Sequence, residues 1–251
     1  MTAHALAELD RSNTLLAARP LSPQLRASIE ADWEIGQTYN SNAIEGNTLT
    51  LSETKAVLLH GVTVSGHPLR EHLEAVNHRE AWRFMRRMAM GGQIVTEEDI
   101  LSLHRIILTG IQSEEAGRYR RERVRIAGAS LILPNPLKVP ELMADFAREL
   151  GNPAGLHPVT HAARVHYGLV AIHPFIDGNG RTARLLMNLL LLRSGYPAAL
   201  IPVGQRAQYY TALEAANIGD LLPFEAFITE RVRESVRDLL ALTDAGEEEN
   251  V

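Results

Sequence analysis

The stretch 173–184, which reads HPFIDGNGRTAR, gathers residue types suited to phosphate chemistry. Gly178, Asn179 and Gly180 can adopt backbone angles that other residues avoid, so a turn built from them can direct several N–H groups at one point. A helix is expected to begin there, and the unpaired amides and positive dipole end of a helix N-terminus bind anions, most often phosphate. We therefore expect an anion-binding turn in this stretch.

Four side chains beside the turn each add a chemical function. Arg181 and Arg184 lie three residues apart and supply planar guanidinium groups that suit phosphate oxygens. Asp177 would repel phosphate unless a cation lies between them, and Mg²⁺ held by one carboxylate and phosphate oxygens is the usual cation. His173 can accept a proton near neutral pH. Together these groups predict phosphoryl or nucleotidyl transfer, without deciding which phosphorus is attacked.

Two apolar helices are expected to hold this stretch. Residues 158–172 place apolar side chains at three- and four-residue spacing, as one buried helix face requires. A second helix, 181–193, is apolar almost all round from Leu185 to Leu192, which is typical of a helix inside a protein. A histidine before proline, a GNG turn or spaced arginines are each common in ordinary structural contexts. Their concentration in one short connection between buried helices favours a functional site.

The stretch matches the pattern HxFx(D/E)GNGRxxR at every defining position, and on these residues the chain resembles the Fic family. The resemblance implies an enzyme, a nucleotidyltransferase that moves AMP from Mg-ATP to a Ser, Thr or Tyr hydroxyl of a target protein. His173 would then be the base that removes the hydroxyl proton, and Asp177 would hold Mg²⁺ against the α- and β-phosphates. The turn would cradle these phosphates, and Arg181 and Arg184 would hold the β- and γ-phosphates.

The segment from Ser41 to Gly46 carries a second motif. On its residues alone, Glu45 is an acid near the C-terminal end of an expected helix that begins at Ser22-Pro23, where an acid is unfavourable against the helix dipole. The segment also matches [S/T]xxxE[G/N], which self-inhibited Fic proteins carry on a helix beside the nucleotide site. The continuation NAIEGNTLTLSE resembles the subgroup in which this helix precedes the Fic core. The resemblance implies that Glu45 pairs with Arg184 and so inhibits the enzyme.

Composition limits the class of protein. The chain has 251 residues, of which 45% are hydrophobic, so a globular fold with a sizeable core is expected. A net charge of −5 gives no general attraction to nucleic acid or anionic membranes. The absence of cysteine favours a reducing compartment, and the first residues lack the layout of a signal peptide. We therefore expect a cytoplasmic protein that binds neither nucleic acid nor membrane.

The stretch 117–126 is rich in arginine. Its arginines at 121, 123 and 125 alternate with other residues, which is the period of a strand. With the extended piece 130–133 it predicts a β-hairpin, whereas one isolated basic segment is weak support for nucleic-acid binding. The resemblance implies that this hairpin is a flap along which the target protein docks, near 118–133, by strand pairing. It also places four residues over the nucleotide, namely Ile126, Ala127, Gly128 and Ala129.

Residues 205–217 predict a helix with two adjacent tyrosines, Tyr209 and Tyr210, that point to different faces. Core packing of at least one of them is the ordinary expectation. The resemblance places both tyrosines and Asn217 around the adenine of ATP. The four histidines between 157 and 173 have a spacing that does not suit zinc, because only the first two share a helical face.

The pattern of helices predicts an all-α protein, a Fic-type helical bundle with a short β-hairpin flap. We expect an N-terminal helical region at 1–94 with the inhibitory motif at 41–47, a Fic core at 95–215, and a C-terminal helix and acidic tail at 216–251. A homodimer through the exposed parts of helix 69–90 is left open. Three other functions are also open: removal of AMP from a modified protein, transfer from another nucleotide donor, and a non-enzymatic nucleotide-sensing module.

Overall fold

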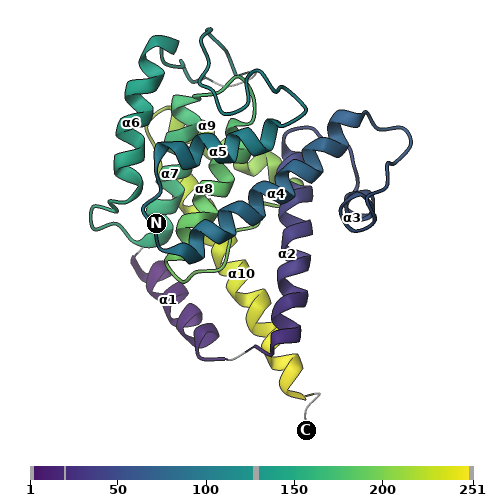
Figure 1. The fold of residues 1–251 in the computed structure, drawn as a ribbon. Helices are drawn as coiled ribbons and strands as arrows, with labels where there is room; N and C mark the ends of the chain where they lie inside the picture. Colours follow the sequence, from purple (N-terminus) through teal and green to yellow (C-terminus); the bar gives the residue numbers. More distant parts are fainter. Residues whose placement is uncertain (1–2, 20, 127–129, 249–251) are drawn as a thin grey trace.

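The computed structural model describes residues 3–19, 21–126 and 130–248, and in these ranges it contains only helices and irregular segments (Figure 1). The helices are α1 (Ala3–Ala17), α2 (Pro23–Ile44), α3 (Leu51–His60), α4 (Leu69–Gly91), α5 (Glu97–Leu108), α6 (Val139–Leu150), α7 (Pro158–Ile172), α8 (Asn179–Arg193), α9 (Arg206–Asn217) and α10 (Leu222–Glu248), with the 3-10 turns η1 (Pro136–Lys138) and η2 (Val203–Gln205). The all-α prediction is confirmed.

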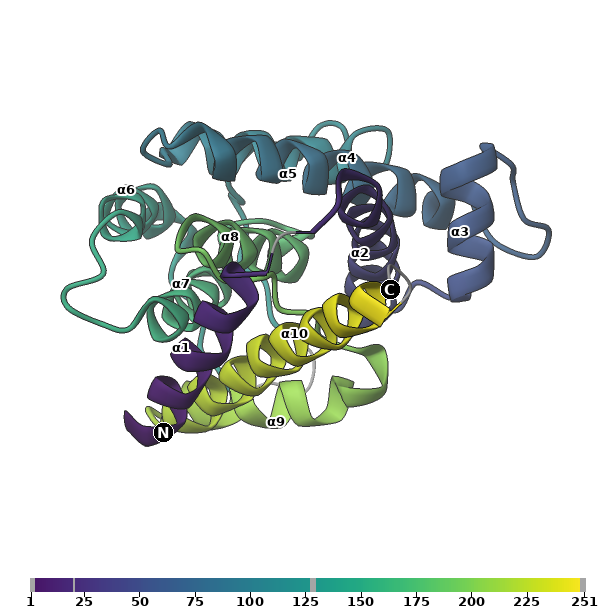
Figure 2. The same cartoon turned by 90° about the horizontal axis from the view of Figure 1, so that it is seen from below.

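Helix α8 lies at the centre of the bundle. It packs against α7, α4, α5 and α2, and Figure 2 shows it between the layer of α4 and α5 and the layer that holds α7, α9 and α10. Leu185, Leu186 and Leu189 are at most 1% exposed. Burial of one such side chain stabilises a fold by about 1.5–3 kcal/mol. The apolar body of α8 therefore anchors the helix whose first turn carries the arginines of the signature.

Helix α2 begins where the sequence predicts and places the motif of residues 41–47 beside α8. Ser22 accepts a hydrogen bond from Leu25 N, and Pro23 occupies the first helical position. The helix ends at Ile44, so its last turn lies beside the start of α8. Helix α3 begins with the predicted capping box of Thr50 and Glu53. It contacts α2 and α4 and lies to one side of the bundle (Figure 1).

The predicted β-hairpin flap is wrong for the described residues. Neither 119–126 nor 130–135 contains a strand or a strand ladder. Pro134 and Pro136 have no N–H to donate, which removes ladder bonds from the second segment. Instead, the side chain of Arg120 donates to the carbonyls of Glu122 and Pro134, so one guanidinium joins the two segments. The alternating arginines show the period of an extended chain, which does not require a partner strand.

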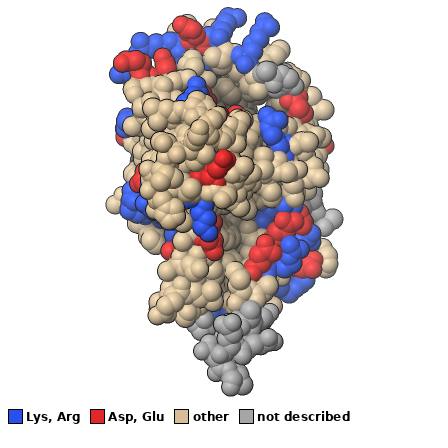
Figure 3. All heavy atoms as spheres, turned by 90° about the vertical axis from the view of Figure 1, so that its right-hand side faces the viewer, with Lys and Arg blue, Asp and Glu red and all other residues tan. Residues whose placement is uncertain are grey.

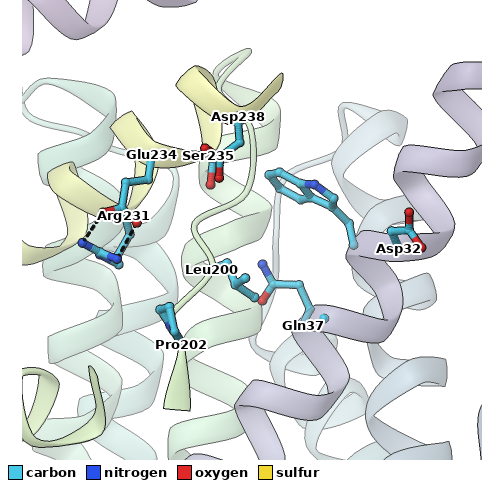
Figure 4. A pocket seen from close by; sticks show the side chains of 10 residues that line it. Asp32, Gln37, Leu200, Pro202, Arg231, Glu234, Ser235 and Asp238 are labelled. Atoms are coloured by element: carbon cyan, nitrogen blue, oxygen red, sulfur yellow. Dashed lines mark hydrogen bonds and ion pairs between the residues drawn. The ribbon is translucent and has the colours of Figure 1, made fainter. Parts of the chain in front are cut away.

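A cavity of about 240 Å³ lies between α2 and α10 (Figure 4). Gln37 lines it from α2, and Arg231 and Glu234, which form a two-bond ion pair of 2.7 and 3.0 Å, line it from α10. Gln37 donates to the carbonyl of Ala199 at 3.0 Å. No residue of the 173–184 stretch contributes to this cavity. It is therefore separate from the candidate site.

Charges of both signs are interspersed on the face shown in Figure 3, and uncharged atoms separate them. That face presents no continuous basic track of the kind that follows a nucleic-acid backbone. Among the described residues, no helix combines the length and the apolar character needed to cross a bilayer.

Because burial lowers the pKa of three imidazoles, we expect acid to destabilise the fold. Burial lowers the pKa of His78 and of His166 to about 3 and that of His104 to about 4. Below pH 6.5 the unfolded chain binds protons that the folded chain does not, so the free energy of unfolding falls as the pH falls towards 4. Each imidazole contributes up to about 2 kcal/mol of this loss at pH 5. We expect the urea midpoint at pH 5 to lie well below that at pH 7.

The variant His78→Asn should reduce the proton uptake on unfolding at pH 5 by about one proton. The matched control is His60→Asn, at an exposed imidazole. Equal midpoints at the two pH values would contradict the burial of neutral imidazoles.

Candidate active site

The candidate site is built on the turn between α7 and α8. His173 ends α7 in the left-handed region, with φ 49° and ψ 59°, and donates its N–H to Leu169 O at 2.8 Å. Among the described residues outside glycine, only His173 and Ala154 have positive φ. A non-glycine residue in this region costs about 1–3 kcal/mol, so its surroundings must hold it there. Gly178, with φ 78°, completes the reversal before α8 begins.

Asn179 closes the turn with its side chain. Its Oδ1 accepts from Phe175 N at 3.0 Å, and its Nδ2 donates to Phe175 O at 2.9 Å. The side chain is buried and thus serves the turn, while the predicted cradle depends on main-chain atoms. The N–H groups of the first turn of α8 have no acceptors within the helix. They are the groups on which the predicted anion-binding turn depends.

His104, from α5, holds the turn from outside. Its Nδ1 accepts from Gly117 N at 3.0 Å, so Nε2 carries the proton and donates to Asp177 O at 3.0 Å. Its ring stacks on Phe175, with the centroids 3.6 Å apart and the planes 6° from parallel. Burial lowers the pKa of His104 to about 4, so the imidazole is neutral. It is a fixed support of the turn that carries Asp177.

Both oxygens of the Asp177 carboxylate are engaged. Oδ1 accepts from Gly178 N at 2.6 Å and from Arg181 at 3.1 Å, and Oδ2 accepts from Arg70 of α4 at 2.7 Å. Burial alone would raise the pKa of Asp177, but Arg181, the Gly178 amide and Arg70 outweigh it and lower the pKa. Arg181 also lies 3.5 Å from Glu74 of α4. The carboxylate is therefore ionised and one-third exposed.

Arg184 is buried and tied to α2. Its NH2 donates to Glu45 Oε1 and to Ser41 O, both at 2.8 Å, and its Nε donates to Ser41 Oγ at 2.9 Å. Its NH1 lies 3.4 Å from the hydroxyl of Tyr209, which in turn lies 3.0 Å from His166 Nε2. The structure thus brings Arg184 together with Glu45, the partner implied by the resemblance, and with Ser41 of the same motif, 139 and 143 positions away along the chain.

The Glu45 carboxylate also covers the first turn of α8. A Cβ added to Gly180 would collide with Glu45 Oε1, so glycine leaves the space in which this oxygen lies. A carboxylate beside the N-terminus of a helix is stabilised by the helix dipole. Glu45 therefore lies where an anionic ligand of this turn is expected to bind, and it shares Arg184 with that position.

His173 is neutral near pH 7. Burial lowers its pKa to about 4, and the positive charge of Arg120 acts in the same direction. The Val170 backbone, Glu45 and Asp177 oppose this shift. Its Nδ1 is buried without a hydrogen-bond partner, whereas Nε2 is not among the buried unpaired atoms. Nε2 is therefore the nitrogen that can meet a ligand.

The three residues predicted around adenine differ in burial and in hydrogen-bond partners. Tyr209 is 2% exposed, and its hydroxyl serves Arg184, whereas Tyr210 is half-buried with Arg206 4.7 Å above its ring. Asn217 donates to Glu214 at 2.9 Å, and its Oδ1 is buried without a partner. Glu214 also accepts from Ser130 N and Oγ, at 3.1 and 2.7 Å.

These contacts link α9 to the segment that follows the predicted nucleotide-covering residues. Of the four predicted nucleotide-covering residues, Ile126 lies at the end of the irregular segment 119–126. Ala127, Gly128 and Ala129 lie outside the described residues.

The sequence reasoning missed five residues that support this site: Arg70, Glu74, His104, Arg120 and Arg206. The four-residue spacing of Arg70 and Glu74 is a local signal, and these two residues form an ion pair of 3.1 Å. Nothing in the sequence distinguishes Arg120 from the arginines around it, because its burial depends on distant segments.

The donor set at Asp177 is compatible with Mg²⁺ that is bound mainly by a ligand. The described residues contain no group of three or more His, Cys, Asp or Glu side chains arranged to hold a metal. Mg²⁺ in phosphate-binding sites commonly uses one or two carboxylates, with phosphate oxygens and water for the rest. One ionised and partly exposed carboxylate beside an amide cradle fits this pattern.

Residues 94–191 match the model of the Fic/DOC family. Protein adenylyltransferase Fic of Drosophila mojavensis is 42% identical over 229 residues, which are 90% of this chain and 45% of the relative. The protein of the same name from Drosophila melanogaster is 43% identical over 207 residues, 82% of this chain and 41% of the relative. The chain thus spans less than half the length of these curated relatives.

Two solved structures share the fold over most of the chain. Fic-1 of C. elegans, residues 134–508, superposes with a TM-score of 0.86 at 34% identity, covering 95% of this chain and 71% of that one. A Fic-domain signaling protein from Bacteroides thetaiotaomicron superposes with a TM-score of 0.87 at 27% identity, covering 96% and 97%. With its complete signature, this likeness shows that the chain belongs to the Fic/DOC family.

Proposed function

We propose that this chain is a protein adenylyltransferase that moves AMP from ATP to a hydroxyl side chain of a target protein, and that Glu45 inhibits it. The observation that carries the proposal is the first turn of α8, an amide cradle with the neutral imidazole of His173 at its edge and the Glu45 carboxylate against it. The relatives named protein adenylyltransferase support the choice of reaction.

In the proposed reaction, the target hydroxyl oxygen attacks the α-phosphorus of ATP. The bond between that phosphorus and the oxygen bridging to the β-phosphate breaks, and pyrophosphate leaves. His173 Nε2 takes the hydroxyl proton, which requires the neutral imidazole that the lowered pKa provides. The rate gain then comes from orientation of the two reactants and from stabilisation of charge on the phosphates.

The phosphates would lie over the amides at the start of α8, with Arg181 beside them. Asp177 would hold Mg²⁺, which when bound neutralises negative charge on the phosphates. The guanidinium of Arg184 would hold the γ-phosphate once Glu45 has left it. With Glu45 in place, this guanidinium is committed to Glu45 Oε1 and to Ser41, which supports an inhibited resting state.

Asn217 and Tyr210 support adenine as the base of the donor. The buried Oδ1 of Asn217 lacks a donor, and the exocyclic amino group of adenine can supply one. The half-buried ring of Tyr210 offers a face on which a base can stack.

A cleft of about 750 Å³ between 123–126 and 130–135 supports a docking place for the target. Its walls are irregular segments outside any ladder in the described chain. Apart from Ser130 N and Pro134 O, which bond to Glu214 and Arg120, their main-chain groups are available for pairing with an extended target segment. We further assign 95–215 as the catalytic core, 1–94 as its regulator, and 216–251 as the C-terminal helix and tail.

One observation favours the reverse reaction as a second candidate. Glu45 Oε1 holds Arg184, while Oε2 has no hydrogen-bond partner among the described residues. This oxygen is free to orient a water molecule at the cradle. The same chain would then remove AMP from a modified protein when Glu45 is engaged, and transfer AMP when it is released.

Glu45→Gly should raise AMP transfer. The change frees Arg184 and uncovers the cradle, and a hydrogen bond between charged groups contributes about 1.5–3 kcal/mol, so the rate should rise roughly 10- to 100-fold. The measurement is incorporation of label from α-labelled ATP into protein, with mass spectrometry for the AMP adduct.

The matched control is Glu34→Gln, on the same helix and paired with Arg83 at the surface. An unchanged rate would remove Glu45 from the regulation, and loss of AMP from a modified target by the wild type alone would favour the reverse reaction.

His173→Ala should abolish transfer while ATP still binds. Loss of a general base lowers kcat by about 10²- to 10⁴-fold. The cradle and arginines remain, so ATP affinity measured by calorimetry should change less than about threefold, on the order of 0.7 kcal/mol. In the parent enzyme, activity should persist well below pH 6.5 and fall only as His173 is protonated near pH 4. Transfer that survives the change would show that another group is the base.

Asp177→Asn should weaken metal binding more than nucleotide binding. The amide lacks the negative charge that attracts Mg²⁺, so the metal concentration for half-maximal transfer should rise about tenfold or more, on the order of 1.4 kcal/mol. Titration with Mn²⁺ in the presence of a non-hydrolysable ATP analogue reports the same change without catalysis. Asp145→Asn, on the surface of α6, is the control. An unaltered metal affinity would place the cation elsewhere.

A further inference from the structure

Arg120 is a buried cation that the proposed reaction does not use. It is 2% exposed, and no carboxylate forms an ion pair with it among the described residues. Burial of a charge without a counter-ion is costly, and an apolar side chain of similar length would avoid the cost. Packing alone therefore does not account for this guanidinium. Its hydrogen-bond partners, all of them main-chain carbonyls, indicate what it does.

Two of these bonds hold the end of α7 at the candidate base. The Nε of Arg120 donates to His173 O at 2.8 Å, and its main-chain N donates to Pro174 O at 2.9 Å. His173 has the left-handed backbone conformation that its surroundings must maintain. The two bonds fix the direction of consecutive carbonyls and thereby the conformation that aims the imidazole.

The other two bonds reach both sides of the target cleft. NH1 donates to Glu122 O at 3.0 Å, and NH2 donates to Pro134 O at 2.7 Å. Glu122 immediately precedes the residues that line one wall of the cleft, and Pro134 is one of the residues that line the other. Because no strand ladder joins these segments in the described chain, the guanidinium is a direct link between them.

We propose that Arg120 is a positioning residue that holds the base and the target-docking segments in one geometry, so that a hydroxyl presented by the cleft arrives at His173 Nε2. This inference rests on the proposed transfer reaction. A planar guanidinium with donors in a fixed fork suits this task, because one rigid group satisfies carbonyls from three segments. A small displacement of either reactant can cost about 10²-fold in rate, so such a link acts directly on catalysis.

The charge of Arg120 has a second effect on the same residue. It disfavours the protonated imidazole and so lowers the pKa of His173, in the same direction as burial. A lysine keeps this charge but lacks the planar fork that reaches the three carbonyls, whereas a methionine loses both properties. The two substitutions therefore separate the geometric effect from the electrostatic one.

The test uses the full chain in the Glu45→Gly background, with Arg120→Lys and Arg120→Met. For both variants we expect kcat/KM for a target protein to fall about 10- to 100-fold. ATP affinity should change less than about threefold, because the cradle is separate from these contacts. Amide hydrogen exchange in 121–126 and 130–135 should become faster. The pKa of His173, followed by NMR and assigned with His173→Ala, should rise above about 4 in Arg120→Met, although burial still keeps it below 6.5, and should stay low in Arg120→Lys.

Arg193→Met is the matched control. Arg193 is half-buried and also donates to a main-chain carbonyl, Met88 O at 2.9 Å, but at the far end of α8. The Arg193→Met variant should lower the melting temperature without changing kcat/KM, the hydrogen exchange of the cleft segments or the pKa of His173. If Arg120→Met does not fold, faster exchange and a higher target KM in Arg120→Lys support the link, and unchanged values overturn it.

Variants of Arg120 that lose only thermal stability would show a purely structural role and overturn the inference. Failure of the proposed function has a different result, namely no transfer by Glu45→Gly itself. In that case hydrogen exchange and the pKa of His173 still decide whether Arg120 links these segments.

Discussion

The guanidinium of Arg184 lies inside the bundle, where a charge is tolerated only with partners that replace water. It has them in the carboxylate of Glu45, the carbonyl and hydroxyl of Ser41 and the hydroxyl of Tyr209. A phosphate would satisfy the same guanidinium, and the amides of α8 favour an anion in the same place. Glu45 thus lies where the proposed phosphate ligand would bind. This contact joins the last turn of α2 to α8, and so connects α2 to the candidate site.

The interior around the start of α8 contains an unusual concentration of charge. Arg120, Arg181 and Arg184 are all at most 4% exposed. Arg181 pairs with Asp177 and Glu74, Arg184 pairs with Glu45, and Arg120 is satisfied by carbonyls alone. Such groups are costly to bury, and the apolar body of α8 together with the helices packed on it offsets the cost. The fold therefore concentrates burial of apolar surface next to the polar site that needs it.

The imidazoles in and around this region are kept neutral for different purposes. His104 serves as a fixed donor and acceptor between Gly117 and Asp177, and His166 lies against the hydroxyl of Tyr209. His173 has the same lowered pKa but keeps Nε2 available. Burial sets the protonation state of all three, whereas the remaining ring nitrogen decides whether an imidazole supports the structure or can accept a proton from a ligand.

Much of the fold and of the site could be predicted from local patterns. The cap at Ser22-Pro23, the capping box at Thr50 and the apolar α8 depend on residues a few positions apart, and the structure has each of them. The hairpin was predicted from an alternation that an extended chain also shows. It is wrong because strand pairing requires a partner, and in the described segments side-chain bonds from Arg120 take that place.

By itself, the sequence determined the chemistry of the turn: an amide cradle, a carboxylate, two arginines and an imidazole within one short connection. The motif also pointed to Glu45 and Arg184 as a pair, because both belong to known patterns. Only the tertiary structure decided that Arg70 faces Asp177, that His104 supports the turn and that Arg120 joins His173 to the cleft. These contacts link positions 53 to 107 residues apart. No local pattern encodes them, because burial and partner choice arise only when separate helices pack together.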